Sequence, residues 1–312
     1  MIAQKNQFIG CDKAYGEAEV VVFGAPYDST TSFRPGTRFG PAAMRMESFG
    51  IETYSPLQDR DLVDDAKVFD AGDIELPFGD PKPALKMIER QARKILKDGK
   101  LPFLLGGEHL VTLGSFRAVL EKYPDLVVIH FDAHADLRED YLGNPLSHAC
   151  VLRRIHDLVG DNRIYQFGIR SGTRDEFRFM KDGHVTTEPF SDTTLESVVN
   201  RLAHQSPGTN HQSPITNHQS PITNHQSPST KHQAPIYLTI DLDVLDPSEF
   251  PGTGTQEAGG FRYTQLVNDI RLICSKLNVV AMDNVELNPG LDPTGRSTAL
   301  ACKFLRECLL GL

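Results

Sequence analysis

The chain has 312 residues, 39% of them apolar, which is enough for one large α/β domain or two smaller ones. Its net charge of −9 comes without a basic run or an aromatic-interleaved basic patch, so the composition argues against a nucleic-acid partner. The amino-terminal segment lacks the apolar core of a secretion signal, and no apolar run is long enough to span a bilayer, so we expect no membrane contact. The five cysteines form no Cys-x-x-Cys pair, so we expect a cytoplasmic protein without cysteine-bound metal.

Strand-like and helix-like segments alternate along the chain. The expected strands are 19–25, 67–71, 101–105, 126–132, 163–168, 236–242 and 279–286. The expected helices are 40–48, 82–98, 110–122, 147–158, 194–203, 263–277 and 296–310. This alternation predicts a mostly parallel sheet with helices on both faces, and ligands in such sheets bind beyond the carboxyl ends of the strands.

Two acidic runs lie at such strand ends. Asp132, His134 and Asp136 follow one apolar run, and Asp241 and Asp243 follow another. Because alternate side chains of a strand point the same way, the members of each run are expected to share a face. A cluster of carboxylates beside a buried sheet is unfavourable unless cations neutralise it, and a pair of divalent metal ions would do so.

His109 adds an imidazole after a Gly-Gly pair between an expected strand and helix. His130 lies deeper in its strand, and we interpret it as structural. Two Mn²⁺ ions suit this mixture of carboxylates and imidazoles better than structural zinc, and two such ions about 3.5–4 Å apart can activate a shared water. The candidate metal ligands are therefore His109, Asp132, His134, Asp136, Asp241 and Asp243.

The segment 204–235 departs from the α/β pattern. It repeats a seven-residue unit close to His-Gln-Ser-Pro-Ile-Thr-Asn. The proline in each unit and the scarcity of apolar residues argue against a coiled coil, and a flexible polar chain gives histidines no fixed geometry for a metal. The seven-base unit TCACCAA, repeated three times in frame, encodes this heptapeptide. We expect a low-complexity insert that is disordered, dispensable and remote from the site, within a single domain that spans 1–312.

The chain resembles the ureohydrolases, also called the arginase family, in five motifs: Gly-Gly-Glu-His at 106–109, Phe-Asp-Ala-His-Ala-Asp at 131–136, Thr-Ile-Asp-Leu-Asp-Val-Leu-Asp-Pro at 239–247, Pro-Gly-Thr-Gly-Thr at 251–255 and Asn-Val-Glu-Leu-Asn-Pro at 284–289. Residues 32–41 resemble the agmatinase branch of that family more than the arginases. The resemblance implies a three-layer α/β/α arginase-type fold with about eight strands, two Mn²⁺ ions per subunit, urea release and assembly into a homotrimer or hexamer.

The resemblance also assigns roles. The six candidate ligands match the family's metal-binding positions, His148 matches a proton-shuttling histidine, and Glu286 matches the glutamate that engages the guanidinium. Asp136 is expected to relay a proton as well as bind metal. Two departures stand out: Glu108 replaces a usual Asp, and Gln256 follows the Gly-Thr-Gly-Thr run where Pro is common.

These observations predict hydrolysis of a small cationic guanidino substrate. Agmatine, giving putrescine and urea, is the favoured substrate. Guanidinobutyrate, guanidine and arginine are the alternatives within the enzyme class, although the segment after Asp136 lacks the Asn- and Ser-rich pattern of arginases. A non-catalytic binding or regulatory relative is a further alternative, which would be expected to lack some of the ligands.

Overall fold

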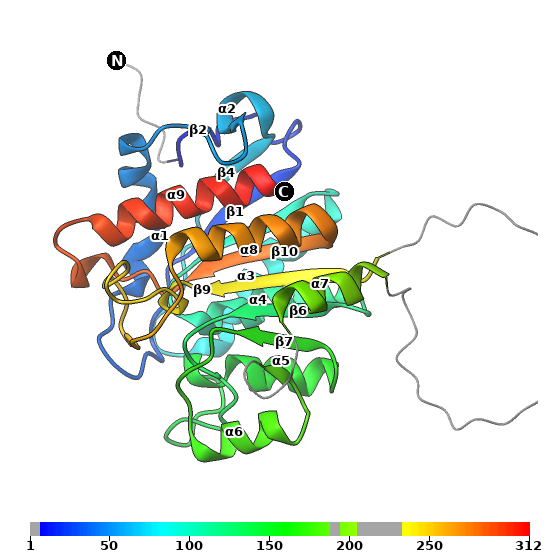
Figure 1. The fold of residues 1–312 in the computed structure, drawn as a ribbon. Coiled ribbons are helices and arrows are strands. Elements are labelled where there is room, and N and C mark those ends of the chain that lie inside the picture. The colour runs from blue at the N-terminus through cyan, green and yellow to red at the C-terminus, as the bar shows by residue number, and fades with distance from the viewer. Residues whose placement is uncertain (1–6, 188–193, 205–232) are drawn as a thin grey trace, which may run out of the picture.

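A computed structural model describes residues 7–187, 194–204 and 233–312. Its centre is an eight-stranded sheet of order β4-β1-β5-β10-β9-β6-β7-β8, in which each pairing is parallel (Figure 1). The strands are β1 Val20–Ala25, β4 Val68–Asp73, β5 Leu101–Gly106, β6 Val127–Phe131, β7 Ile164–Phe167, β8 Thr186–Thr187, β9 Pro235–Asp241 and β10 Asn278–Val285. A separate antiparallel pair joins β2 Tyr54–Ser55 to β3 Arg60–Asp61.

Helices cover both faces of the sheet and make three layers, as the alternating pattern predicted (Figure 1). The α-helices are α1 Gly40–Glu47, α2 Leu62–Asp65, α3 Pro81–Lys97, α4 Thr112–Lys122, α5 Val151–Val159, α6 Arg174–Lys181, α7 Leu195–His204, α8 Tyr263–Lys276 and α9 Arg296–Gly311. Short 3-10 turns are η1 Thr37–Phe39, η2 Ser48–Gly50, η3 His109–Val111, η4 His148–Cys150, η5 Leu242–Val244 and η6 Pro289–Leu291.

Two apolar cores lie between these layers. Alternate residues of β1 enter opposite cores: Val20 and Val22 face the core shared with α1, α7, α8 and α9, whereas Val21 and Phe23 face the core shared with α3, α4 and α5. Strands that are buried on both faces need apolar side chains at nearly every position, which explains the uninterrupted apolar runs in the sequence.

The seven predicted strands and seven predicted helices are present, with ends shifted by a few residues. The segment 147–158 differs most, because it begins as the 3-10 turn η4 before α5. The prediction missed the two-residue strands β2, β3 and β8, which are too short for a periodic signal, and the short helices α2 and α6. Most of the predicted insert, 205–232, lies outside the described residues.

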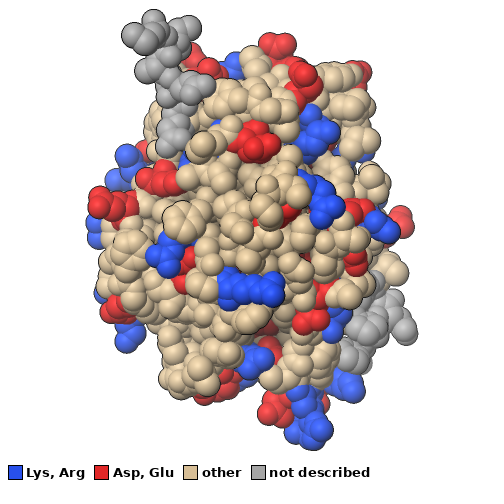
Figure 2. All heavy atoms as spheres, turned by 90° about the vertical axis from the view of Figure 1, so that its left-hand side faces the viewer, with Lys and Arg blue, Asp and Glu red and all other residues tan. Residues whose placement is uncertain are grey.

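The carboxyl ends of the parallel strands define one side of the molecule, which Figure 2 shows face-on. Acidic and basic side chains are interspersed over this side, and neither sign gathers into one large patch (Figure 2). Within the described ranges, no helix combines the length and the apolar character that crossing a bilayer requires.

Candidate metal centre

The candidate ligands come from the ends of three strands. His109 opens η3 just after β5, Asp132 follows β6, and Asp241 ends β9. In the sheet these strands lie in the order β5-β10-β9-β6, so their carboxyl ends meet at one edge. Residues far apart in the sequence are therefore brought to a common point, as parallel α/β sheets commonly do at their ligand sites.

Asp132 lies at the centre of the cluster. Its Oδ2 is 3.1 Å from His109 Nδ1, and its Oδ1 is 3.4 Å from His134 Nδ1. On the first side, His109 Nδ1 also lies 3.2 Å from Asp136 Oδ2 and 3.5 Å from Asp241 Oδ2. On the second side, His134 Nδ1 lies 3.0 Å from Asp243 Oδ2. The six predicted ligands thus converge, and one carboxylate joins two groups of donors.

The way they converge differs from the prediction. Strand alternation was expected to put Asp132, His134 and Asp136 on one face, but β6 ends at Phe131, before all three. Asp136 adopts a left-handed backbone with φ of 53°. Asp243 lies on the turn η5 rather than on β9. The backbone turns that follow the strands therefore set the directions of these side chains, and the expectation based on strand alternation was wrong.

The orientation of His109 fits a metal ion. Its Nε2 contacts Thr239 Oγ1 at 3.0 Å, and Thr239 in turn donates to Asp283 at 2.7 Å. Because the Thr239 hydroxyl proton is used on Asp283, His109 Nε2 donates to Thr239, and Nδ1 is left as the nitrogen that a metal would bind once it is free of a proton. That buried Nδ1 faces three carboxylate oxygens without a hydrogen bond to any of them. A cation between these atoms would satisfy all of them, so the residues present fit a metal.

The pKa shifts within the cluster also indicate that it suits metal ions. Burial raises the pKa of Asp241 well above its usual value, and the nearby Asp243 and Asp132 carboxylates raise it further. Burial disfavours a charged His109, yet the surrounding carboxylates raise its pKa well above the usual value. The pKa of His134 is raised in the same way against burial, chiefly by Asp243 and Asp132. Without metal the cluster must therefore hold protons, and divalent cations would replace them.

His130 supports Asp132 rather than acting as a free ligand. Its Nε2 lies 2.9 Å from Asp132 Oδ2, while its Nδ1 lies 3.1 Å from the side-chain amide of Gln166. Gln166 also donates to Ala135 O at 2.9 Å and accepts from Thr187 at 3.1 Å. His130 Nδ1 therefore accepts and Nε2 donates, which fixes the orientation of the central carboxylate. This agrees with our interpretation of His130 as structural.

Glu286 and His148 lie beside the cluster and touch each other. His148 Nδ1 is 3.2 Å from Glu286 Oε1, and that oxygen also accepts the His109 backbone N–H at 2.8 Å. Burial disfavours the charged ring, but the Glu286 carboxylate raises the pKa of His148 to about 9. On the other side, His148 Nε2 lies 3.0 Å from Ser32 N and 2.9 Å from Ser32 Oγ.

Glu108 holds the loop that carries Ser32. It accepts from Thr30 N at 2.8 Å, from Thr30 Oγ1 at 2.5 Å and from Thr31 Oγ1 at 3.1 Å. Thr30 Oγ1 also accepts the His148 backbone N–H at 3.1 Å. Glu108 is fully buried, and burial raises its pKa to about 7. Glu108 therefore helps to position His148 through this loop.

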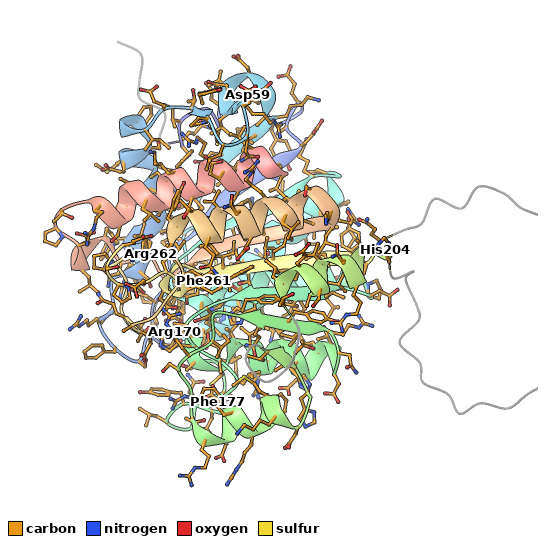
Figure 3. All side chains as sticks on the ribbon, in the orientation of Figure 1. Asp59, Arg170, Phe177, His204, Phe261 and Arg262 are labelled. Carbon is orange, nitrogen blue, oxygen red and sulfur yellow. The ribbon has the colours of Figure 1, made fainter. Side chains whose placement is uncertain are left out.

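Arg170 ties the loop after β9 to the cluster (Figure 3). Its guanidinium donates to Asp243 O at 2.8 Å and to Glu257 O at 2.9 Å. Gln256, the second departure from the family pattern, donates from its side chain to Pro251 O. The 251–257 loop is therefore closed by a side-chain hydrogen bond where the usual proline would restrict the backbone.

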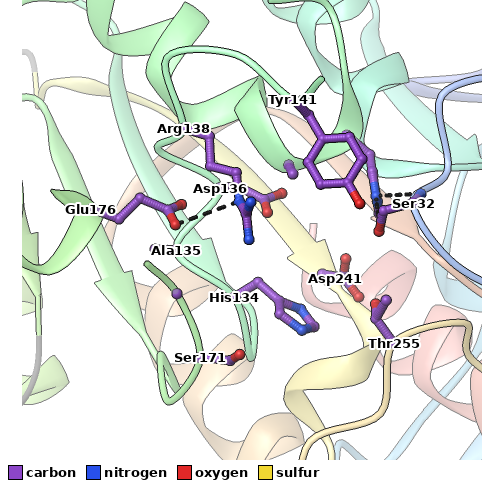
Figure 4. Close-up of a pocket in the computed structure, with 13 residues that line it drawn as sticks. Ser32, His134, Ala135, Asp136, Arg138, Tyr141, Ser171, Glu176, Asp241 and Thr255 are labelled. Carbon is purple, nitrogen blue, oxygen red and sulfur yellow. Dashed lines mark hydrogen bonds and ion pairs between the residues drawn. The ribbon is translucent and has the colours of Figure 1, made fainter. Parts of the chain in front are cut away.

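A cavity of about 230 Å³ opens onto the cluster (Figure 4). Asp136, Asp241 and His148 line its wall. Arg138 and Tyr141 line it as well, with the Arg138 guanidinium 5.3 Å from the Tyr141 ring centroid. Acidic groups, a titratable histidine and a stacked cation therefore share one small polar cavity, which suits a compact charged substrate.

Comparisons with known proteins decide the family. The arginase family model matches residues 18–216 and 215–311. The agmatinase of Bacillus anthracis is 44% identical over 97% of this chain and 95% of its own length. The guanidinobutyrase of Pseudomonas aeruginosa is 32% identical over 92% of this chain and 84% of its own length. The crystal structure of a proposed agmatinase from Clostridium difficile has a TM-score of 0.82 and 45% identity, covering 95% and 98% of the two chains. The chain belongs to the arginase family.

The arginase-type α/β fold predicted from the sequence is thereby confirmed. Sequence reasoning missed several supporting residues of this arginase-family site: Thr30, His130 as a partner of Asp132, Gln166, Thr239 and Asp283. Thr239 had a usable signal, because it lies two residues before Asp241 on the same face of β9. Gln166 and Asp283 had none, since their roles depend on pairing with neighbouring strands.

Proposed function

We propose that this chain is a dinuclear manganese hydrolase that cleaves agmatine to putrescine and urea. The observation that carries the proposal is the convergence of four carboxylates and two imidazoles around Asp132, beside a contacting Glu286–His148 pair. Relatives named agmatinase, at 42–44% identity over nearly the whole chain, support this choice of substrate.

In this proposal, His109, Asp136 and Asp241 would hold one cation, and His134 and Asp243 would hold the other. Asp132 lies between the two groups and would contribute to both. Two divalent cations supply Lewis acidity, which makes a water nucleophilic near neutral pH and stabilises negative charge. The excess of carboxylate oxygen over imidazole nitrogen favours manganese over zinc.

Glu286 would hold the substrate. The guanidinium is planar and cationic, and a carboxylate can accept two parallel hydrogen bonds from it. Oε1 of Glu286 already contacts His109 N and His148 Nδ1, so we assign the principal substrate contact to Oε2. The buried carboxylate would turn the guanidinium carbon toward the cation cluster.

The protons would move through two groups of the chain. Asp136 would take a proton from the attacking water on its carboxylate and pass it to the leaving amine nitrogen as the C–N bond breaks. His148 is buried beside Glu286 and lines the cavity, so it would exchange protons between the amine and the solvent. The Glu286 carboxylate raises the pKa of His148 to about 9, and bound cations would lower that value.

Guanidinobutyrate is the second candidate substrate. Arg138 lines the cavity, and its guanidinium lies 3.7 Å from Glu176 (Figure 4). A carboxylate at the far end of a substrate would pair with Arg138, whereas the ammonium of agmatine would be repelled by it and attracted to Glu257. The Glu257 carboxylate lies 3.8 Å from His134 Nε2.

Urea release with and without manganese tests the proposal. The purified chain should be assayed with agmatine, guanidinobutyrate, arginine and guanidine after chelation and after addition of Mn²⁺. We expect manganese-dependent urea release with the highest kcat/KM on agmatine. Higher kcat/KM on guanidinobutyrate would support the second candidate, and no urea from any of the four would refute a ureohydrolase.

A homotrimer or hexamer and a cytoplasmic location remain predictions. Sedimentation of the purified chain would check the first, and fractionation of the source cells the second.

A further inference from the structure

A second group of metal-binding residue types lies away from the cavity. His156 is on α5, Asp161 follows the end of that helix, and His184 precedes β8. His156 Nε2 is 2.8 Å from Asp161 Oδ1, and His184 Nδ1 is 3.0 Å from the same oxygen. The three donor atoms lie within 4.8 Å of one another. The residues that line the cavity and surround Asp132 contribute nothing to this group.

The spacing of these donors is close to that of a metal site. A tetrahedral zinc ion binds nitrogen and oxygen at about 2.0–2.2 Å, so neighbouring donors lie about 3.3 Å apart. The two histidine contacts with Asp161 are 2.8 and 3.0 Å, and the two imidazole nitrogens lie within 4.8 Å of each other. Each histidine would therefore need to move only about half an ångström away from Asp161. The two rings share one acceptor oxygen, and a single cation could replace both shared protons.

Packing holds the two rings in place. Phe179 of α6 stacks on His184 at 4.3 Å between ring centroids and meets His156 edge-on at 4.8 Å. The His156 carbonyl accepts the Gly160 N–H at 2.8 Å, where the glycine ends α5 with a φ of 74°. The donors thus come from a fixed helix end and a ring-stacked segment rather than from free side chains.

The charges around these three residues are also compatible with a bound cation. The contacts with His156 and His184 lower the pKa of Asp161, so its carboxylate is ionised. A positive charge that bears on the same aromatic ring is Arg153, whose guanidinium lies 4.7 Å from the Phe179 ring centroid. That charge is offset by Glu139 at 2.8 Å and Asp157 at 3.4 Å.

We propose that His156, Asp161 and His184 form a separate site for one divalent transition-metal cation of the zinc type. Two imidazoles and a single carboxylate suit zinc, nickel or copper better than manganese or magnesium. Asp161 and His184 are half-exposed, so water can complete the coordination. The bound ion would link the end of α5 to the chain that enters the edge strand β8. The proposal is independent of the reaction at the cavity.

Zinc stoichiometry tests this site. Wild-type protein and the His184→Ala variant should be freed of metal, equilibrated with the same buffered free zinc and analysed for bound metal. We expect the variant to bind one equivalent less. Any zinc that enters the Asp132 cluster contributes equally to both proteins and cancels in the difference. His204→Ala removes another exposed histidine, at the end of α7, and should bind as much zinc as the wild type.

Asp161→Asn gives an independent test, because asparagine keeps the size and the hydrogen-bonding oxygen but removes the charge. We expect the same loss of one equivalent, together with a smaller zinc-dependent rise in melting temperature than in the wild type. Equal zinc content in wild type, His184→Ala and Asp161→Asn would overturn the proposal. So would a zinc-dependent rise in melting temperature that is the same in all three proteins.

Discussion

His148 Nδ1 lies 3.2 Å from Glu286 Oε1, so the proposed proton donor touches the proposed substrate anchor. Glu286 raises the pKa of that ring against the effect of burial. One contact thus couples substrate binding to proton supply, because a cationic guanidinium on Glu286 would lower the pKa of His148 and favour release of its proton.

Replacing His148 with Ala should lower kcat by about 10²-fold, the usual contribution of a positioned acid. KM should change little and metal content should not change, since the ring is not one of the six proposed ligands. Steady-state kinetics across pH, with metal analysis of the same samples, check this. Ser197→Ala, on α7, is a control expected to behave as the wild type. A pH–kcat profile identical to wild type would contradict a shuttle.

Replacing Asp243 with Ala should remove metal and activity together. The carboxylate lies 3.0 Å from His134 Nδ1, so its loss leaves that side of the cluster short of a ligand. Metal content and urea release should fall in parallel. Replacing Asp246, which is also after β9 but binds Ser248 N and Gly259 N, should leave metal content unchanged. Full urea release by Asp243→Ala would contradict its assignment as a ligand.

Metal binding should release protons near neutral pH. The pKa values of His109 and His134 lie well above their usual value in the metal-free cluster, and a ring must be neutral to bind metal. Apparent affinity should therefore rise with pH. Calorimetric titration of manganese in buffers of different ionisation enthalpy measures the released protons. An observed enthalpy that does not depend on the buffer would contradict the protonated cluster.

Thr239→Val should weaken metal binding by about 10- to 100-fold, as loss of a residue that orients a ligand typically does. The valine keeps the shape but removes the hydroxyl between His109 Nε2 and Asp283. Competition with a chelator gives the affinity. Thr264→Val, at an exposed position on α8, is the matched control. Equal affinity in both variants would show that His109 does not need this contact.

Replacing residues 205–232 with a short Gly-Ser linker should leave kcat and metal content unchanged. His204 ends α7 and lies far from the cluster side of the sheet (Figure 3). The following strand β9 begins at Pro235 and reaches the cluster only at Asp241, about 20 Å further along. Kinetics and melting temperature of the shortened chain check this, and a loss of activity without loss of folding would assign the repeats a role.

The fold could be predicted from the sequence because strands buried on both faces leave uninterrupted apolar runs and long helices leave a clear periodic pattern. The apolar runs before Asp132 and Asp241 marked strands that the structure confirms. The two-residue strand β8 left no comparable signal, because pairing with β7 defines it.

The convergence of the six proposed ligands could be predicted because each lies at or shortly after the end of a strand, and parallel strands bring such ends together. The directions in which their side chains point could not be predicted. The left-handed backbone of Asp136 and the turn at Asp243 depend on local hydrogen bonds and packing. The roles of Thr30 and Glu108 could not be predicted for the same reason, because their contact joins segments 78 residues apart in the sequence.

Asp136 and Glu286 share one further property. Both have positive φ, 53° and 66°, a region that side chains other than glycine adopt at a cost of about 1–3 kcal/mol. Glycine would relax the chain at either position, yet it would remove the carboxylate. At both positions a substitution that relieves backbone strain would therefore raise stability and lower turnover. A selection for thermostability alone should erode catalysis there first.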